Sequence, residues 1–517
     1  MEFMEPKNHT DCQSMISNVR IAKNSIFMSI RMIVVLCVTL YSTRIILNAL
    51  GVEQYGIFNV VAGFVGLFSF LSTSMSNSIQ RFYNFEYARN GLSGAQKVFN
   101  SSLFIQIILA VLLICILESL GPWYIRNKMV LPYSQIDTAV CLFHCSVLGF
   151  LCAIIQTPFL AAVMAHERMG FYSIMSVLDA FLKLLIAFIL PYLAWEPLLT
   201  YGILLVTVSL FVFVLYFIYA KINFEEIRFT FNCDSSLLKA MLSFSGWNLF
   251  GTFSGIMKDQ GVNLIMNLFF GPIVNAAKGV ATQVNNGIQS FISNIIIPVR
   301  PQLVQSYSIG NIDRVMQLTY SVSKLSTFML YMISLPLLYE LDYILDIWLG
   351  DNIPEYTGSF IRIVILMSFI NNLNASISGV VHATGRMKKY QLSGAIVNLL
   401  AIPIVYISLK LGGSPILGMA LVAFVTLVNQ LVCMIVLKSI VSYSIKDYLR
   451  RVVLPFLIVA CTTCWIPCLI IDLVGSSFYR LCLVILISIS VVLPTIYFIG
   501  LSTDERVYVR TILGSRR

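Results

Sequence analysis

The sequence predicts an all-α, polytopic membrane protein. Hydrophobic residues make up 58% of its 517 residues and charged residues only 11%, which is far from the composition of soluble globular domains. Apolar runs long enough to cross roughly 30 Å of hydrocarbon recur along the chain, and residue types of the first half return in the second. We therefore expect about 14 transmembrane helices, with two parallel six-helix repeats around a central cavity and a C-terminal helix pair.

The expected elements follow in order along the chain. Residues 1–24 are polar, lack the apolar core of a signal peptide and form a cytoplasmic N-terminal segment. The further predicted divisions are an N-lobe of six spans at 25–221, a cytoplasmic linker at 222–243, a C-lobe of six spans at 244–438, a helix pair at 439–501 and a cytoplasmic tail at 502–517. The spans themselves are expected near 26–48, 55–78, 98–121, 138–162, 171–193, 200–220, 246–269, 273–297, 318–340, 360–382, 391–411, 416–437, 452–473 and 478–500.

Charged loop residues predict the orientation of these spans, because Lys and Arg accumulate in short loops on the cytoplasmic side. Placing the N-terminus inside puts most basic residues in cytoplasmic segments, whereas four acidic residues gather in the outside connection after the ninth span. These are Asp342, Asp346, Asp351 and Glu355. Both termini are then cytoplasmic, and the net charge of +10 reflects topology rather than nucleic-acid binding.

Paired residues mark the internal repeat. Asn48 and Asn267 lie 219 residues apart, and the stretch AHERMGFY at 165–172 returns 218 residues later as ATGRMKKY, without the histidine and glutamate. Six spans are an even number, so both copies enter the membrane from the same side and form parallel repeats. We interpret the shared frame as a cytoplasmic hairpin in which Arg168 and Arg386 are orientation charges rather than parts of a catalytic or metal site.

The end of the first span carries a family resemblance. The stretch RIILNALGVEQYGIF at 44–58, followed by Arg81 and Phe82 at the end of the second span, resembles the opening signature of polysaccharide exporters. This family, which includes O-antigen flippases, belongs to the multidrug/oligosaccharidyl-lipid/polysaccharide (MOP) exporter superfamily. The second half keeps Gly271 near the equivalent place but lacks the Tyr-Gly pair.

The resemblance implies a flippase rather than an enzyme. Its expected substrate is an undecaprenyl-pyrophosphate-linked oligosaccharide, such as an O-antigen, capsule or exopolysaccharide repeat unit, carried across the bacterial inner membrane by alternating access. The expected partners are this polyprenyl-linked glycan, membrane lipid and the glycan polymerase machinery, around a monomeric transport unit. The last two helices are expected to cover a groove for the polyprenyl chain.

Cations within the spans indicate the same function independently. A Lys or Arg at the bilayer centre costs roughly 2.5–3.5 kcal/mol on insertion scales and therefore faces a partner or a water-filled cavity. Lys258 lies about 12 residues into the seventh expected span, too deep to snorkel to the interface. We expect it to bind pyrophosphate through charge-assisted hydrogen bonds together with Lys278, Arg31 and Arg44. Snorkelling stays the alternative for these other three residues, which lie nearer to span ends.

Amide side chains at helical spacing predict a surface for sugar. Gln80 ends a stripe of serines and threonines in the second span, and the eighth span carries Gln283, Asn286 and Asn294. The donors and acceptors of an amide are hard to satisfy between packed helices, so we expect these four side chains to bind the glycan. Helix packing through small polar residues stays the alternative, above all for the serines.

Two carboxylates are candidates for coupling transport to an ion. Asp179 precedes Lys183 by four residues, which favours an intrahelical ion pair. Asp259 adjoins Lys258, but successive helical residues diverge by about 100° and do not face each other. These carboxylates would also suit a MATE-like multidrug antiporter, the main alternative, although the excess of intramembrane cations argues against it. A glycan polymerase or ligase is a further alternative, which the short outside loops disfavour.

No cofactor or metal is expected. The sequence contains no Walker-type phosphate loop. Cys461, Cys464 and Cys468 lie in an apolar span, where free cysteine behaves as a small hydrophobic residue.

Overall fold

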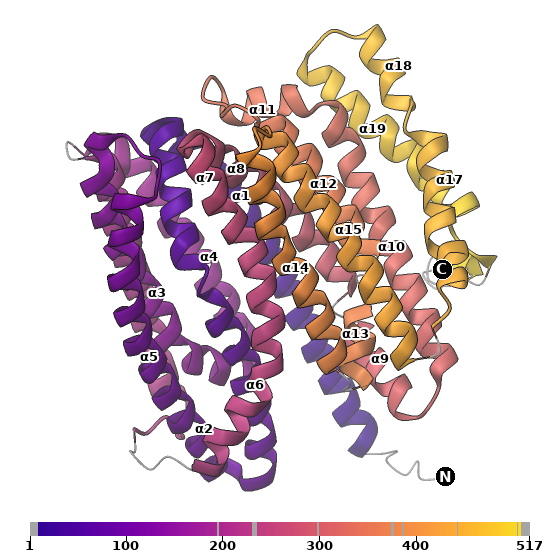
Figure 1. The fold of residues 1–517 in the computed structure, drawn as a ribbon. Coiled ribbons are helices and arrows are strands. Elements are labelled where there is room, and N and C mark those ends of the chain that lie inside the picture. The colour runs from indigo at the N-terminus through magenta and orange to yellow at the C-terminus, as the bar shows by residue number, and fades with distance from the viewer. Residues whose placement is uncertain are drawn as a thin grey trace, which may run out of the picture. The chain divides into compact units, whose positions relative to one another are not determined.

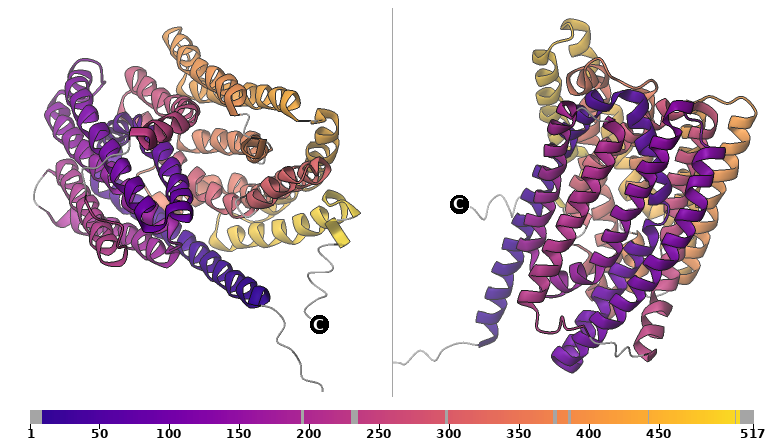
Figure 2. Two further views of the ribbon diagram at one scale, coloured as in Figure 1. Left: turned by 90° about the horizontal axis from the view of Figure 1, so that it is seen from below. Right: turned by 90° about the vertical axis from the view of Figure 1, so that its left-hand side faces the viewer.

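A computed structural model of the chain describes residues 9–193, 196–229, 235–296, 299–373, 377–384, 387–441, 443–503 and 505–507. Every regular element within these residues is a helix. The chain forms two compact units, and the long helices of each unit lie side by side (Figure 2). The first unit comprises residues up to Ala49, Phe68–Asn127 and Ser134–Gly246; the second comprises Leu50–Leu67, Lys128–Tyr133 and Trp247–Arg517.

The first unit is built around the contact of α2 with α3 and of α3 with α5, which lie side by side in Figure 1. Phe99 of α2 and Phe159 of α3 are buried edge to face, with ring centroids 5.3 Å apart. The helices that contribute to this unit are α1 (His9–Gly66), α2 (Ser69–Asn127), α3 (Ile136–Ala165), α4 (Met169–Ile189), α5 (Pro197–Asn223) and α6 (Ser235–Ile256), with the 3₁₀ turns Tyr133–Gln135 and Leu190–Tyr192.

The second unit contains the end of α1 and the remaining helices. Its helices include a π-helical turn η3 (Met257–Gly261), α7 (Val262–Phe270), α8 (Pro272–Ile296), α12 (Thr357–Leu373), α14 (Met387–Lys410) and α15 (Pro415–Ile440). The other elements are α9 (Arg300–Ser308), α10 (Ile312–Tyr339), α11 (Leu341–Leu349), α13 (Ile377–Thr384), α16 (Ile445–Tyr448), η5 (Leu449–Val453), α17 (Leu454–Thr463), α18 (Ile466–Leu473), α19 (Phe478–Thr495) and η6 (Ile496–Gly500).

The C-terminal helices of the second unit pack on α10. Phe328 and Leu335 of α10 form a buried cluster with Val459 of α17 and Val492 of α19, and the three helices stand together in Figure 1. This apolar contact anchors the C-terminal helix pair to the second unit.

Within the described residues, ten helices are long and apolar enough to cross a membrane, which makes the chain a multi-pass membrane protein. The second, seventh, eighth and tenth of the expected spans are not among these ten. The expected seventh and eighth spans form α6 to α8, which carry several of the polar residues described below and are therefore less apolar. The total of 14 spans and the layout of two repeats stay predictions.

Two glycines with positive φ mark helix breaks. Gly51 breaks α1 with φ 75° and ψ 168°, and Gly271 separates α7 from α8 with φ 74° and ψ −170°. Positive φ is accessible to glycine at little cost. The two glycines, which the sequence places at nearly equivalent positions of the two halves, therefore have closely similar backbone conformations.

The segment that follows Gly51 belongs to the second unit, although the sequence places it in the N-lobe. Gly56 explains this assignment, because a Cβ atom there would lie 1.9 Å from the carbonyl oxygen of Pro272. Only a residue without a side chain allows α1 to approach the start of α8 this closely. The Tyr-Gly pair of the family-like signature thus has a packing role in this chain.

Candidate functional site

The second unit encloses a polar cavity of about 390 Å³. The end of α1, the π-helical turn η3 and helices α7, α8, α12 and α15 line it. Its polar lining residues are Asn59, Lys258, Asp259, Gln260, Asn263, Lys278, Thr282, Gln283, Asn285, Asn286, Ser368 and Asn371. Five of the residues predicted from the sequence therefore share one cavity.

Lys258 lies in the π-helical turn and is buried, with 8% of its surface exposed. Its Nζ donates a hydrogen bond to Oγ1 of Thr426 on α15, at 3.3 Å. Within the described part of the chain its ammonium forms no ion pair. A π-helical turn inside a helix is rare and frequently marks a functional site. The buried charge predicted here is thus held beside a cavity by a neutral hydroxyl group.

Lys278 reaches the same turn from α8. Its Nζ donates to the backbone carbonyl oxygen of Asp259, at 2.5 Å. The side chain of Asp259 is exposed, and it forms no ion pair with Lys258 among the described residues, as their adjacent helical positions predict. The cavity wall therefore carries two ammonium groups and one carboxylate.

Gln283 and Asn286 on α8 line the cavity as well. Neither side-chain amide has a hydrogen-bond partner among the described residues, and Asn286 is exposed. Their donors and acceptors are consequently free for a ligand. Two neighbouring amides are engaged within the protein instead: Asn285 Oδ1 accepts from Ser368 at 2.6 Å, and Asn371 Oδ1 accepts from Gln430 at 2.9 Å.

A second set of amides, which the sequence did not single out, joins α7 to α8. Asn275 Nδ2 donates to the carbonyl oxygen of Asn263 at 2.7 Å, and Asn267 Nδ2 donates to Asn275 Oδ1 at 3.1 Å. Asn267 Oδ1 also accepts from the backbone of Val130 at 3.1 Å. In the sequence, only the spacing of Asn263 and Asn267 by about one helical turn indicated that these two amides share a helix face. These contacts stabilise the wall on which Asn263 meets the cavity.

Of the remaining predicted residues, Arg31, Arg44, Gln80 and Asp179 belong to the first unit. Arg31 lies over the ring of Tyr172 at 5.0 Å and donates to Ser176 at 3.5 Å. Asp179 forms the expected ion pair with Lys183, with Oδ2 and Nζ 2.7 Å apart. Arg44 and Gln80 are half-buried in this unit, and the side chain of Asn294 lies outside the described residues. A single pyrophosphate site formed by all four predicted cations stays a prediction.

The histidine of the AHERMGFY stretch has a partner far along the chain. His166 Nε2 lies 2.5 Å from Oε1 of Glu226, which also accepts a hydrogen bond from the hydroxyl group of Tyr83. The His166 ring stacks on Phe224, with centroids 4.3 Å apart. Burial of Glu226 opposes its ionised form, but the hydrogen bonds from His166 and Tyr83 outweigh this effect and lower its pKa. This cluster ties the part of α2 before Gly91 to the ends of α3 and α5 within the first unit.

These helices have the fold of transporters of the MOP superfamily. No protein-family model and no curated protein matches the sequence. The chain is similar in structure to an inward-facing multidrug resistance MATE family transporter of this superfamily, with a TM-score of 0.65 and 12% identity over 79% of this chain and 97% of that one.

Two further solved structures have the same fold. The lipid II flippase MurJ in an inward closed conformation matches 94% of this chain and 100% of its own length, with a TM-score of 0.64 and 15% identity. A MOP superfamily transporter from Pyrococcus furiosus, described as having a binding pocket of reverse polarity, matches 81% of this chain and 95% of its own, with a TM-score of 0.60 and 15% identity. At these identities the likeness establishes the fold.

Proposed function

We propose that the protein is a flippase that moves an undecaprenyl-pyrophosphate-linked oligosaccharide from the cytoplasmic to the periplasmic leaflet of a bacterial inner membrane by alternating access. The observation that carries this proposal is the cavity of the second unit. Lys258 and Lys278 line it together with the amides of Gln283 and Asn286, which have no hydrogen-bond partner among the described residues. The fold that the chain shares with a lipid II flippase is compatible with such a substrate.

The chemistry of the cavity suits the two polar parts of this substrate. A pyrophosphate away from bulk water requires charge-assisted donors, and both ammonium groups are held by neutral oxygen atoms rather than by carboxylates. An anionic group that enters the cavity therefore does not have to displace a carboxylate from either lysine. The hydroxyl groups of the glycan would bind to the free amides of α8.

Four further residues are assigned on the sequence alone. Arg31 and Arg44 are assigned to the pyrophosphate with the two lysines, and Gln80 and Asn294 to the glycan. The transport unit is a monomer that hands its product to the glycan polymerase machinery. Asp259 and Asp179 are the proposed coupling carboxylates.

A proteoliposome assay with a fluorescent undecaprenyl-pyrophosphate oligosaccharide tests the lysines. A hydrogen bond to a charged group contributes about 1.5–3 kcal/mol, so Lys258→Ala and Lys278→Ala should each slow flipping about tenfold or more. Lys389→Ala is the matched control, because Lys389 is exposed at the start of α14 and does not line the cavity. Flipping at the wild-type rate in Lys258→Ala/Arg31→Ala would refute the site.

A MATE-like, ion-coupled multidrug antiporter is the second candidate. The exposed carboxylate of Asp259 favours it, because Asp259 lines the cavity and would attract a cationic drug. Expression of the protein in a drug-sensitive strain discriminates the two functions. Drug resistance that Asp259→Asn abolishes, with no flipping of the lipid-linked glycan in proteoliposomes, would establish the antiporter.

A further inference from the structure

A second cavity, of about 470 Å³, lies among α10, the π-helical turn η5 and the C-terminal end of the last helix. Its walls come from residues near the start of the span Ile312–Tyr339, the start of Ile445–Ile471 and the end of Phe478–Gly500. Three spans thus begin or end around it. The cavity therefore lies at the boundary between membrane and water.

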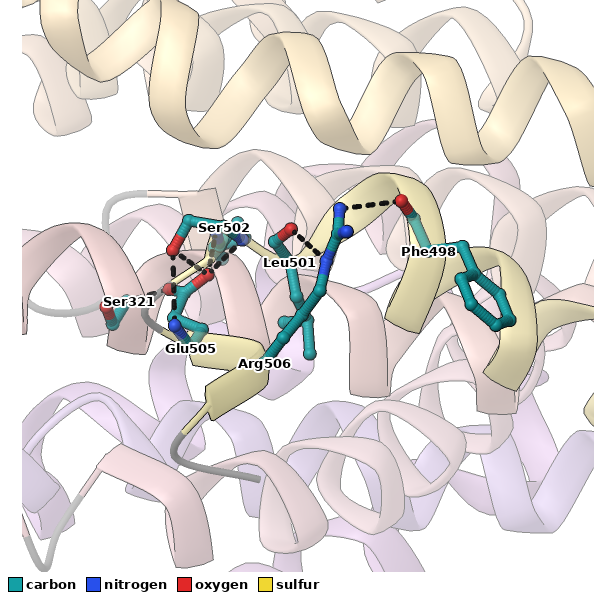
Figure 3. Close-up of polar contacts among 7 residues, drawn as sticks. Ser321, Phe498, Leu501, Ser502, Glu505 and Arg506 are labelled. Atoms are coloured by element: carbon teal, nitrogen blue, oxygen red, sulfur yellow. Dashed lines mark hydrogen bonds and ion pairs between the residues drawn. The ribbon is translucent and has the colours of Figure 1, made fainter. Parts of the chain in front are cut away.

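The deepest cation of this cavity is already neutralised. Lys324 of α10, whose side chain is 6% exposed, forms an ion pair with Glu505. Glu505 also accepts from the hydroxyl group of Ser321 at 2.9 Å and from the backbone of Ser502 at 2.8 Å (Figure 3). Arg506 donates to the carbonyl oxygens of Leu501 and Phe498 and holds this C-terminal segment in place (Figure 3).

Two arginines of the cavity, in contrast, have no anionic partner among the described residues. Arg450 and Arg451 are exposed on η5, and neither guanidinium forms an ion pair with any residue that the structure describes. Arg451 lies 6.0 Å from the ring centroid of Tyr320. With Lys324 and Glu505 paired, Asp447 is the carboxylate that remains in the lining. The mouth of the cavity therefore has an excess of positive charge.

An apolar surface continues from the arginines along the membrane-spanning helices. Leu454 and Leu457 of α17 are 50% and 49% exposed, and Phe498 of the last helix is 65% exposed. The two leucines directly follow η5 in the chain, and Phe498 directly precedes the C-terminal segment. They supply the surface that acyl chains require beside a charged headgroup.

We infer that this cavity binds the phosphate headgroup of an anionic phospholipid, with Arg450 and Arg451 as its donors and the acyl chains on the exposed apolar residues of α17 and the last helix. Guanidinium groups suit phosphate because they donate two hydrogen bonds in a fixed geometry. The adjoining apolar surface favours a lipid over a free phosphate ion. The inference does not depend on the transported substrate.

Native mass spectrometry of the full-length protein in detergent tests this site. Phosphatidylglycerol is titrated against phosphatidylcholine with the same acyl chains, and inorganic phosphate is titrated in a third arm. The wild-type protein should bind phosphatidylglycerol more tightly than phosphatidylcholine. Each basic residue near a membrane surface contributes about fivefold, so Arg450→Ala/Arg451→Ala should weaken phosphatidylglycerol binding about 25-fold.

Lys388→Ala/Lys389→Ala is the matched control, because it removes the same charge from the start of α14, outside the cavity. It should leave the affinity for phosphatidylglycerol unchanged. If the double arginine variant does not fold, Arg450→Ala takes its place, since it keeps the contact between Arg451 and Tyr320 and should weaken binding about fivefold.

Three results would overturn the inference. They are equal affinity of the wild-type protein for the two lipids, the same loss of affinity in the arginine and lysine variants, and inorganic phosphate that displaces phosphatidylglycerol at equal concentration. The last result would assign the cavity to a free anion.

Discussion

Lys258 is a buried lysine whose ammonium group donates a hydrogen bond to the hydroxyl group of Thr426. Its depth in a long apolar run predicts burial, and the structure confirms it. Its contact with Thr426 joins two helices that are 168 residues apart in the chain. No periodicity of the sequence encodes that contact, because it depends on which face of α15 packs toward η3.

Thr426→Val tests this contact, because valine keeps the shape of threonine and removes the hydroxyl group. We expect a loss of about 1–3 kcal/mol in the free energy of unfolding, since the buried ammonium loses its hydroxyl partner. Thermal unfolding in detergent measures this loss. Thr207→Val is the control. The hydroxyl groups of Thr207 and Thr426 both donate to the carbonyl oxygen four residues earlier, but Thr207 is exposed on α5. If both substitutions lowered the free energy of unfolding equally, the loss in Thr426→Val could not be attributed to the hydrogen bond with Lys258.

Glu226 predicts a pH dependence for the first unit. Its pKa in the folded protein lies below the ordinary value of 4.5, because hydrogen bonds from His166 and Tyr83 outweigh burial. A lowered folded pKa stabilises the protein above the unfolded value, and this stabilisation is lost as pH falls below about 4.5 toward the folded pKa. Intrinsic amide exchange slows between pH 7 and pH 3.5, so the quantity to compare is the protection factor, which should fall for the segment after α5 over this range.

Glu226→Gln should flatten this dependence and raise exchange at pH 7. Glu225→Gln is the neighbouring control, because Glu225 is exposed and should leave the profile unchanged. A profile of the Glu226→Gln variant that follows the wild type would show that the contact with His166 does not stabilise this end of the unit.

At the scale of elements, close approaches between helices shape the cavity. A Cβ atom at Gly63 would lie 2.7 Å from Oε1 of Gln260, and one at Gly279 would lie 2.5 Å from Oδ1 of Asn59. Glycine at these positions lets α1 approach η3 and α8. The end of α1 can therefore place Asn59 on the cavity wall although it is about 200 residues away in the chain from η3.

Gly56→Ala tests the tightest of these approaches. The new methyl group would overlap the backbone carbonyl of Pro272, which cannot rotate away as a side chain does. Overpacking typically costs about 1–3 kcal/mol, so we expect a lower melting temperature and poor expression. Gly255→Ala is the control, because no atom lies within 4 Å of its new Cβ and alanine favours helix. Similar melting temperatures of the two variants would contradict the packing role of Gly56.

At the scale of the whole molecule, the C-terminal segment is joined to α10 across 181 residues by the ion pair of Glu505 and Lys324. Hydrogen bonds from Lys324 and Ser502 outweigh burial and hold the pKa of Glu505 below its usual range. The pair secures the end of the chain to the helix that carries the buried cluster with α17 and α19.

Glu505→Gln leaves the buried Lys324 charge without its counter-ion. Breaking a buried pair costs about 3–5 kcal/mol, so we expect a marked fall in the unfolding temperature and rapid proteolysis of the C-terminal segment. Asp179→Asn breaks the half-exposed pair with Lys183 and should cost at most about 1 kcal/mol. A smaller effect at Glu505 than at Asp179 would contradict this account, and limited proteolysis with thermal unfolding measures both.

Local patterns predicted the contacts that lie within one helix. The ion pair of Asp179 and Lys183 follows from a spacing of four residues. The contact of His166 with Glu226 and the amide network of Asn263, Asn267 and Asn275 were missed. These contacts depend on two or more elements meeting, and a polar residue carries the same local signal whether it bonds to a neighbouring helix or faces a ligand.

The sequence by itself determined that this is a helical, multi-pass membrane protein, because long apolar runs leave the backbone no other way to satisfy its hydrogen bonds in lipid. The tertiary structure alone decided which polar residues share a cavity. It joined Lys258, Lys278, Gln283 and Asn286 within the second unit and engaged Asn285 and Asn371 in contacts within the protein. The physical reason is that helix periodicity specifies which residues of one helix share a face. Close packing between helices, at residues such as Gly56, decides which other helix that face contacts.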